Sequence, residues 1–196
     1  MTLLKTAAAA AALTLFGAIH ASAAVFAFDS NLSGDQEVPP VVTPASGSAE
    51  LKVNDVTETL SFMMSIEGID LDGLFDDLVA APVGPVHLHN APAGSNGPIV
   101  VPFAFNTVDY TDTASGFTLE VEDYAYADAV AISGSTTSFS DFLTGLSSGE
   151  YYINVHTDAF GSGELRGQLS AVPVPASALL LIGAIAGFGA LRRKSA

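Results

Sequence analysis

Apolar and polar residues alternate in short stretches through most of the chain, and Gly, Pro, Asn, Asp and Ser separate these stretches. Alternation with a period of two sends successive side chains to opposite faces of a strand, so the pattern predicts β-strands. The predicted strands span residues 49–53, 59–66, 85–89, 99–105, 117–121, 151–156 and 164–169. Many short strands at this spacing indicate an all-β fold, either an immunoglobulin-like sandwich or a small Greek-key barrel.

Two short stretches depart from this alternation and favour helices in the connections between strands. They are residues 71–80 and residues 138–146. The second stretch follows a run of Ser and Thr whose hydroxyl groups can cap a helix N-terminus.

The N-terminus carries an apolar stretch that is typical of a targeting segment. Lys5 precedes an Ala- and Leu-rich run over residues 6–19, and Ala21 and Ala23 occupy the two small positions of a signal peptidase site. We therefore expect residues 1–23 to be a signal peptide that signal peptidase removes after Ala23. Residues 24–171 then form one β domain.

The C-terminus carries a second apolar stretch, and no charged residue occurs over positions 170–191. About 20 such residues are enough for a helix to cross the hydrocarbon core of a bilayer, so the sequence predicts a transmembrane helix here. The stretch begins with Val172, Pro173, Val174, Pro175 and Ala176, and it ends before Arg192, Arg193 and Lys194. The positive-inside rule places these cations on the cytoplasmic side.

This order of parts resembles the C-terminal sorting signal of Gram-negative exosortase substrates, the PEP-CTERM class, and most closely its VPLPA variant. Val174 stands where that variant has Leu. The resemblance implies that residues 172–196 hold the chain transiently in the inner membrane. An exosortase-type enzyme then removes the tail and leaves the protein at the cell surface or in the extracellular matrix. An ordinary C-terminal membrane anchor is the alternative, and it differs in that the tail is kept.

Charge and cysteine content narrow the function classes of the central domain. All 21 Asp and Glu residues of the chain but only two of its six Lys and Arg residues fall within positions 24–171, which gives this region a formal charge of −19. Such a domain repels phosphate groups, so nucleic acid is excluded as a partner. The chain has no cysteine, so its core or a bound ion must stabilise the domain without disulfides.

Histidines supply the candidate chemistry of the domain. His20 leaves with the signal peptide, and the other three lie in two predicted strands. His87 and His89 share one face because they are two residues apart, and His156 on a neighbouring strand completes a set of three nitrogens. Three imidazoles are a sufficient ligand set for Zn²⁺ or Cu²⁺. Asp158 could add an oxygen ligand or orient an imidazole by accepting its other N–H. Hydrogen-bonded structural histidines are the alternative.

Four ordered blocks of the domain resemble the motifs of the CHRD domain, first named in chordin. The blocks are residues 32–40 (LSGDQEVPP), 87–89 with 97–100 (HLH and GPIV), 149–157 (GEYYINVHT) and 163–169 (GELRGQL). The similarity extends from about residue 32 to residue 170. It implies an all-β domain of the immunoglobulin-like or barrel type.

A looser similarity, in the ligand constellation only, is to copper–zinc superoxide dismutases. These β-barrels also use a His-x-His strand, a later histidine and an arginine near the metal, for which the equivalents here are His87, His89, His156 and Arg166. No histidine between positions 90 and 155 can bridge two metals, and there is no cysteine pair. Alternatively, Arg166 pairs with Glu164 or Glu37, because a buried cation needs a partner.

Two function classes remain open at this point. The first is an exported extracellular or envelope protein that works without catalysis, as a binding or matrix component with a three-histidine metal site and an unknown partner. The second is a copper or zinc metalloenzyme with redox chemistry similar to that of a superoxide dismutase. The sequence leaves open whether the protein is an enzyme.

Overall fold

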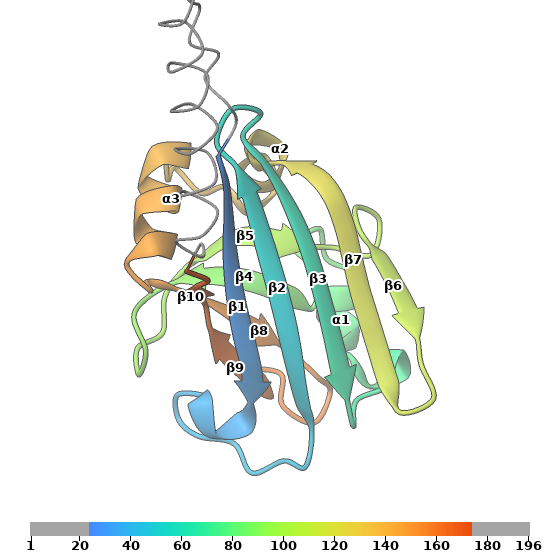
Figure 1. Ribbon diagram of the computed structural model, residues 1–196. Helices are drawn as coiled ribbons and strands as arrows, with labels where there is room; N and C mark the ends of the chain where they lie inside the picture. Colours follow the sequence, from blue (N-terminus) through green and yellow to red (C-terminus); the bar gives the residue numbers. More distant parts are fainter. Residues whose placement is uncertain (1–23, 174–196) are drawn as a thin grey trace, which may run out of the picture.

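Ten antiparallel strands form one continuous sheet in the computed structural model, which describes residues 24–173 (Figure 1). The strands are β1 (Val25–Ser33), β2 (Ser46–Asn54), β3 (Thr59–Glu67), β4 (Val86–Asn90), β5 (Ile99–Phe103), β6 (Asp109–Asp112), β7 (Gly116–Ala125), β8 (Tyr151–Val155), β9 (Leu165–Gln168) and β10 (Ser170–Ala171). Their order across the sheet is β5-β4-β8-β9-β1-β2-β3-β7-β6, and β10 pairs with β1. The all-β prediction is therefore confirmed.

The sheet curls on itself, so that β4 and β5 lie behind β2 and β3 (Figure 1). Phe62 on β3 and Phe103 on β5 stack with ring centroids 4.4 Å apart, although five strands lie between β5 and β3 in the order of the sheet. A continuous hydrophobic core fills the space between the two halves. The result is a barrel-like half-closed sheet, in agreement with the expected sandwich or barrel class.

Strand pairing sorts the side chains of β4, β8 and β9 onto two faces. Val86 and Leu88 are fully buried and belong to the hydrophobic core. The alternate positions of the three strands are all polar or aromatic and lie opposite one another in the sheet register, where paired residues share a face. We call this set the polar face: His87, His89, Tyr152, Asn154, Arg166 and Gln168.

Loops cover the polar face, so its residues are not left in solvent. Asn96 reaches from the loop after β4 and donates to the carbonyl oxygen of Val38 at 2.8 Å. Gln168 donates to the carbonyl oxygen of Ala91 at 3.1 Å. As a consequence, even a charged side chain on this face, that of Arg166, is only 1% exposed.

Short helices fill the connections between strands. They are η1 (Gly34–Gln36), η2 (Leu71–Gly73), α1 (Asp76–Val79), α2 (Tyr126–Ser133) and α3 (Phe139–Ser147). The predicted helix over 71–80 is divided between η2 and α1. The predicted helix over 138–146 is α3, and the Ser138 hydroxyl caps it by accepting from the Asp141 N–H at 3.1 Å.

Both predicted targeting segments fall largely outside the described residues. The signal peptide, residues 1–23, and the sorting signal from Val174 onward lie beyond them. Of the sorting motif, Val172 and Pro173 are described, and the Val172 N–H donates to the carbonyl oxygen of Ala27 at 2.9 Å. Between residues 24 and 173, none of the helices has the length and apolar character needed to span a membrane.

Candidate metal centre

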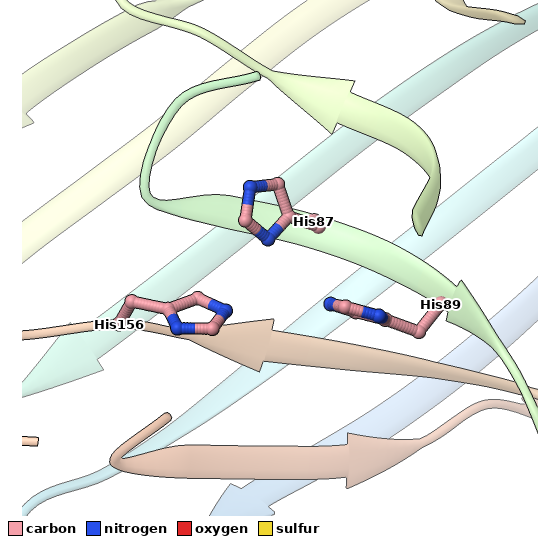
Figure 2. A group of neighbouring side chains, drawn as sticks. All are labelled: His87, His89 and His156. Atoms are coloured by element: carbon pink, nitrogen blue, oxygen red, sulfur yellow. The ribbon is translucent and has the colours of Figure 1, made fainter. Parts of the chain in front are cut away.

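Three histidines from the ends of two adjacent strands turn their rings toward a common space (Figure 2). His87 and His89 project from β4, and His156 lies directly after β8. The ring centroid of His87 is 5.4 Å from that of His89 and 5.0 Å from that of His156. One ring nitrogen from each residue lies within 4.8 Å of the other two. The structure thus brings together the three histidines that the sequence pointed to.

Backbone hydrogen bonds fix which nitrogen two of these rings present. The Nδ1 atoms of His89 and His156 lie 3.0 Å from the carbonyl oxygens of Gly97 and Gly161, respectively. A carbonyl oxygen only accepts, so each Nδ1 must carry the proton. In the neutral ring the lone pair is then on Nε2, which is the form of histidine that ligates metals.

The free nitrogens of the cluster are buried without partners. His89 and His156 are partly exposed as whole residues, yet their Nε2 atoms are buried. His87 is 1% exposed, and neither of its ring nitrogens has a hydrogen-bond partner among the described residues. A buried polar atom without a partner costs about 1–3 kcal/mol, so the cluster is unfavourable unless something else binds it.

Burial also keeps the three rings neutral. Loss of hydration, with smaller contributions from His156 and His89, lowers the pKa of His87 from its ordinary value of 6.5 to about 3, against the opposing influence of the Gly84 backbone. Burial lowers the pKa of His89 to about 4, although its hydrogen bond with Gly97 acts in the opposite direction. The pKa of His156 is lowered for the same reason. Neutral rings at pH 7 have the lone pairs that a cation needs.

Two backbone hydrogen bonds hold His156 in place although it lies beyond the last residue of β8. Its N–H donates to the carbonyl oxygen of Pro85 at 2.9 Å, and its own carbonyl oxygen accepts from the Phe75 N–H at 3.1 Å. The next residue, Thr157, forms an isolated bridge with Leu74. The connection that contains η2 and α1 therefore acts as one more strand-like support beside the site.

Asp158 does not have the role expected from its position two residues after His156. Its Oδ1 atom accepts from the Asp76 N–H at 3.0 Å, and its N–H donates to the carbonyl oxygen of Gly73. It is therefore committed to the loop, because the carboxylate caps the start of α1. The glycine carbonyls described above orient the imidazoles instead.

Arg166 reaches the cluster only through Tyr152. Its Cζ atom lies 3.5 Å from the centroid of the Tyr152 ring. The Tyr152 ring also stacks with the His89 ring, with centroids 4.9 Å apart and an angle of 8° between the ring planes. Among residues 24–173, neither Glu164 nor Glu37 forms an ion pair with it within 4.0 Å, so the expected pairing is wrong. Arg166 donates instead to neutral acceptors on Asn96, Pro92 and Gln168.

Sequence reasoning missed the residues that support the ligands. Tyr152 was not singled out, although its position opposite His89 follows from the pairing of β4 with β8. The carbonyl groups of Gly97 and Gly161 left no signal, because every residue has a carbonyl and only the folded loops bring these two to the rings.

Comparison with protein families matches residues 28–169 to the CHRD domain. The match covers nearly all of the described sheet, from β1 to the residue after β9, and includes all three histidines. Comparison with curated proteins gives no match, and neither does comparison with solved structures. From the extent of the family match, the chain belongs to the CHRD domain family.

Proposed function

We propose that this chain is an exported CHRD-domain protein that binds one copper or zinc ion through His87, His89 and His156. The observation that carries the proposal is the convergence of three neutral imidazoles whose free nitrogens are buried without partners. A structural histidine cluster would satisfy these nitrogens with protein groups, since buried polar atoms are nearly always hydrogen-bonded. One cation satisfies one nitrogen of each ring at once.

The spacing of the nitrogens suits this ion after a small contraction. Three atoms within 4.8 Å of one another share a point that is at most about 2.8 Å from each, and metal–nitrogen bonds are about 2.0–2.1 Å long. Each nitrogen therefore needs to move inward by about 0.7 Å or less, which a small rotation of an imidazole provides. The hydrogen bonds to Gly97 and Gly161 hold the rings in the required orientation during this movement.

The chemistry of the donors favours copper or zinc over hard cations. Imidazole nitrogen binds Zn²⁺ and Cu²⁺ well, whereas Mg²⁺ and Ca²⁺ prefer carboxylate, carbonyl and water oxygens. Asp158, the nearest acidic residue along the chain from His156, is occupied by the Asp76 backbone. Three protein ligands leave the fourth position of a tetrahedral ion for water or a partner.

Export rests on the sequence and on the character of the domain. The expected signal peptide over residues 1–23 and the expected sorting signal over 172–196 support passage across the inner membrane of a Gram-negative bacterium. The formal charge of −19 over 24–171 suits a soluble domain at the cell surface or in the extracellular matrix. We propose a binding or matrix role there, with signal peptidase and an exosortase-type enzyme as processing partners.

One observation favours a second candidate, a copper enzyme with redox chemistry. Arg166 is a buried cation whose guanidinium lies over the Tyr152 ring, which stacks on His89, and a positive charge near the fourth coordination position would attract a small anionic substrate such as superoxide. The constellation supplies one metal position, without a bridging histidine, so it supports a mononuclear site. Superoxide turnover by the copper-loaded protein would select this candidate.

Metal titration of the full chain, purified in a mild detergent and stripped with a chelator, tests the proposal. We expect one Cu²⁺ or Zn²⁺ per chain by isothermal titration, and loss of binding by about a hundredfold or more when His89→Leu removes a ligand. The matched control is Gln168→Leu, which lies opposite Tyr152 on the same face and leaves the three rings in place. Absence of stoichiometric binding, or equal binding by the His89→Leu variant, would refute the proposed site.

A further inference from the structure

A surface pocket on the covered polar face carries a second inference, which does not rest on the proposed metal. The pocket has a volume of about 340 Å³ and lies between β9 and the segment around η1. Its lining includes one buried cation, Arg166, and one buried carboxylate, Glu37. We propose that it binds a small zwitterion of the α-amino acid class, with Arg166 holding the carboxylate and Glu37 the ammonium group.

Arg166 has donors left for such a carboxylate. Its Nη1 donates to Asn96 Oδ1 at 3.2 Å, and its Nη2 donates to the Pro92 carbonyl oxygen and to Gln168 Oε1. A guanidinium group has five N–H donors in a fork that matches a carboxylate. These three bonds leave the Nε–H and one Nη1–H without an acceptor among the described residues.

The charge of Arg166 is also unpaired. At 1% exposure, its side chain is one of the most buried of the molecule. The only ion pair within residues 24–173 joins Lys52 and Glu50 on β2, whereas Arg166 lies on β9. Buried charges are normally paired, so a guanidinium that meets only neutral acceptors and the face of Tyr152 is suited to receive an anion.

Glu37 is a buried carboxylate in the same pocket, and no cation contacts it within residues 24–173. It is 6% exposed, its two oxygens accept from the Asn154 amide at 3.0 and 3.3 Å, and the Val38 backbone also acts on the carboxyl. Burial raises the pKa of this carboxyl, whereas the charge of Arg166 acts to lower it. The two groups therefore sense each other, yet they are not within 4.0 Å. A carboxylate with no cation in contact is suited to receive an ammonium group.

The pocket as a whole selects for a ligand with both charges. Asp35 and Glu37 would repel a simple anion, and Arg166 would repel a simple cation. A zwitterion bridges the two buried groups and leaves no charge unpaired. Val38 and Pro40 form an apolar part of the wall, against which an aliphatic side chain would pack. The volume is near the lower end of the range for small-molecule pockets, as expected for a ligand of this size.

The test is a calorimetric titration of the full chain, in mild detergent and with chelator present, against each of the common L-amino acids. The tightest binder is then compared with its own amide, which lacks the carboxylate, and with its N-acetyl derivative, which lacks the ammonium group. We expect binding of one amino acid per chain, and each derivative to bind about tenfold more weakly or worse because one buried charge stays unpaired.

Two variants assign the ends of the ligand. Glu37→Gln keeps an acceptor for Asn154 but removes the negative charge, so the amino acid should bind about tenfold more weakly while the N-acetyl derivative is little affected. Glu50→Gln, an exposed carboxylate away from the pocket, is the control and should change neither affinity. If Glu37→Gln fails to fold, the comparison of derivatives on the unaltered chain decides. The inference is overturned if no amino acid binds, or if either derivative binds as tightly as the parent.

Discussion

A variant with leucine in place of His87 should be more stable than the natural chain without metal and less stable than it with metal. His87 is fully buried, and its two ring nitrogens have no partner among the described residues. Each such atom costs about 1–3 kcal/mol, whereas leucine has a similar size and no polar atom. Part of this gain is lost because leucine does not match the shape of the imidazole ring, so without metal the His87→Leu variant should be more stable than the natural chain by about 1–2 kcal/mol.

Metal should turn this difference around. A ligand that binds only the folded state at about 100 times its dissociation constant stabilises that state by about 2.7 kcal/mol. The natural chain gains this stabilisation, while the His87→Leu variant loses most of it because one of three ligands is missing. For a domain of this size, 1 kcal/mol corresponds to a shift in Tm of about 2–4 °C, which thermal unfolding resolves easily.

The assay is thermal unfolding of both proteins, once with a chelator and once with excess Zn²⁺. The control is Tyr126→Phe on α2, away from the histidines, which removes a buried hydroxyl that does have a partner, because it donates to the carbonyl oxygen of Thr137 at 2.9 Å. This control should lose about 1–2 kcal/mol under both conditions and keep the full response to Zn²⁺. A His87→Leu variant that is less stable than the natural chain in chelator would show that His87 is a structural residue and would refute the reasoning.

Three further predictions concern pH, backbone packing and processing. Because burial lowers the pKa of His87 to about 3 while the unfolded ring titrates near 6.5, stability in chelator should be full above pH 6.5 and fall on acidification, by up to about 1.4 kcal/mol per pH unit for this ring. Urea unfolding at pH 7.5 and 5.5 measures the slope, which should be shallower for the His87→Leu variant; an unchanged slope contradicts the assignment. Gly163→Ala should destabilise by about 1–3 kcal/mol, because its φ is +126° and a Cβ would lie 2.5 Å from Asn154 Oδ1, whereas Gly73→Ala meets no atom closer than 3.9 Å and should be tolerated in the same unfolding assay. Mass spectrometry of the exported protein should give a chain that begins at Ala24 and lacks the basic tail; retention of the tail would indicate an ordinary membrane anchor.

The sequence predicted strands at the positions of β2 to β5 and β7 to β9, but it missed the short strands β6 and β10 and the central strand β1. Clear alternation marks residues 59–66, and β3 spans Thr59–Glu67. β1 lies between β9 and β2, yet its first residues, Val25 to Phe28, are continuously apolar and merge with the signal peptide in the sequence. The helix α2 was missed because its Val, Ile and Tyr residues are typical of strands, and packing against β5 decides its conformation.

The candidate site was predictable only in its ligands. The two-residue spacing placed His87 and His89 on one face, and the strand that ends before His156 supplied the third ring. Its surroundings depend on loops, which the alternation of residues does not describe. Asp158 was the expected partner of an imidazole because it is close in sequence, but the folded loop turns its carboxylate to the Asp76 N–H.

X-ray absorption spectroscopy of the metal-loaded full chain tests the central claim most directly, because it reports the atoms bound to the ion. The proposal predicts one copper or zinc ion per chain with three imidazole nitrogens at about 2.0–2.1 Å and a fourth, light-atom ligand from solvent. In the His87→Leu variant the imidazole contribution should fall to two rings or disappear with the metal. A spectrum dominated by oxygen ligands, or the same three-imidazole spectrum from the variant, would contradict the assignment of His87, His89 and His156 as a metal site.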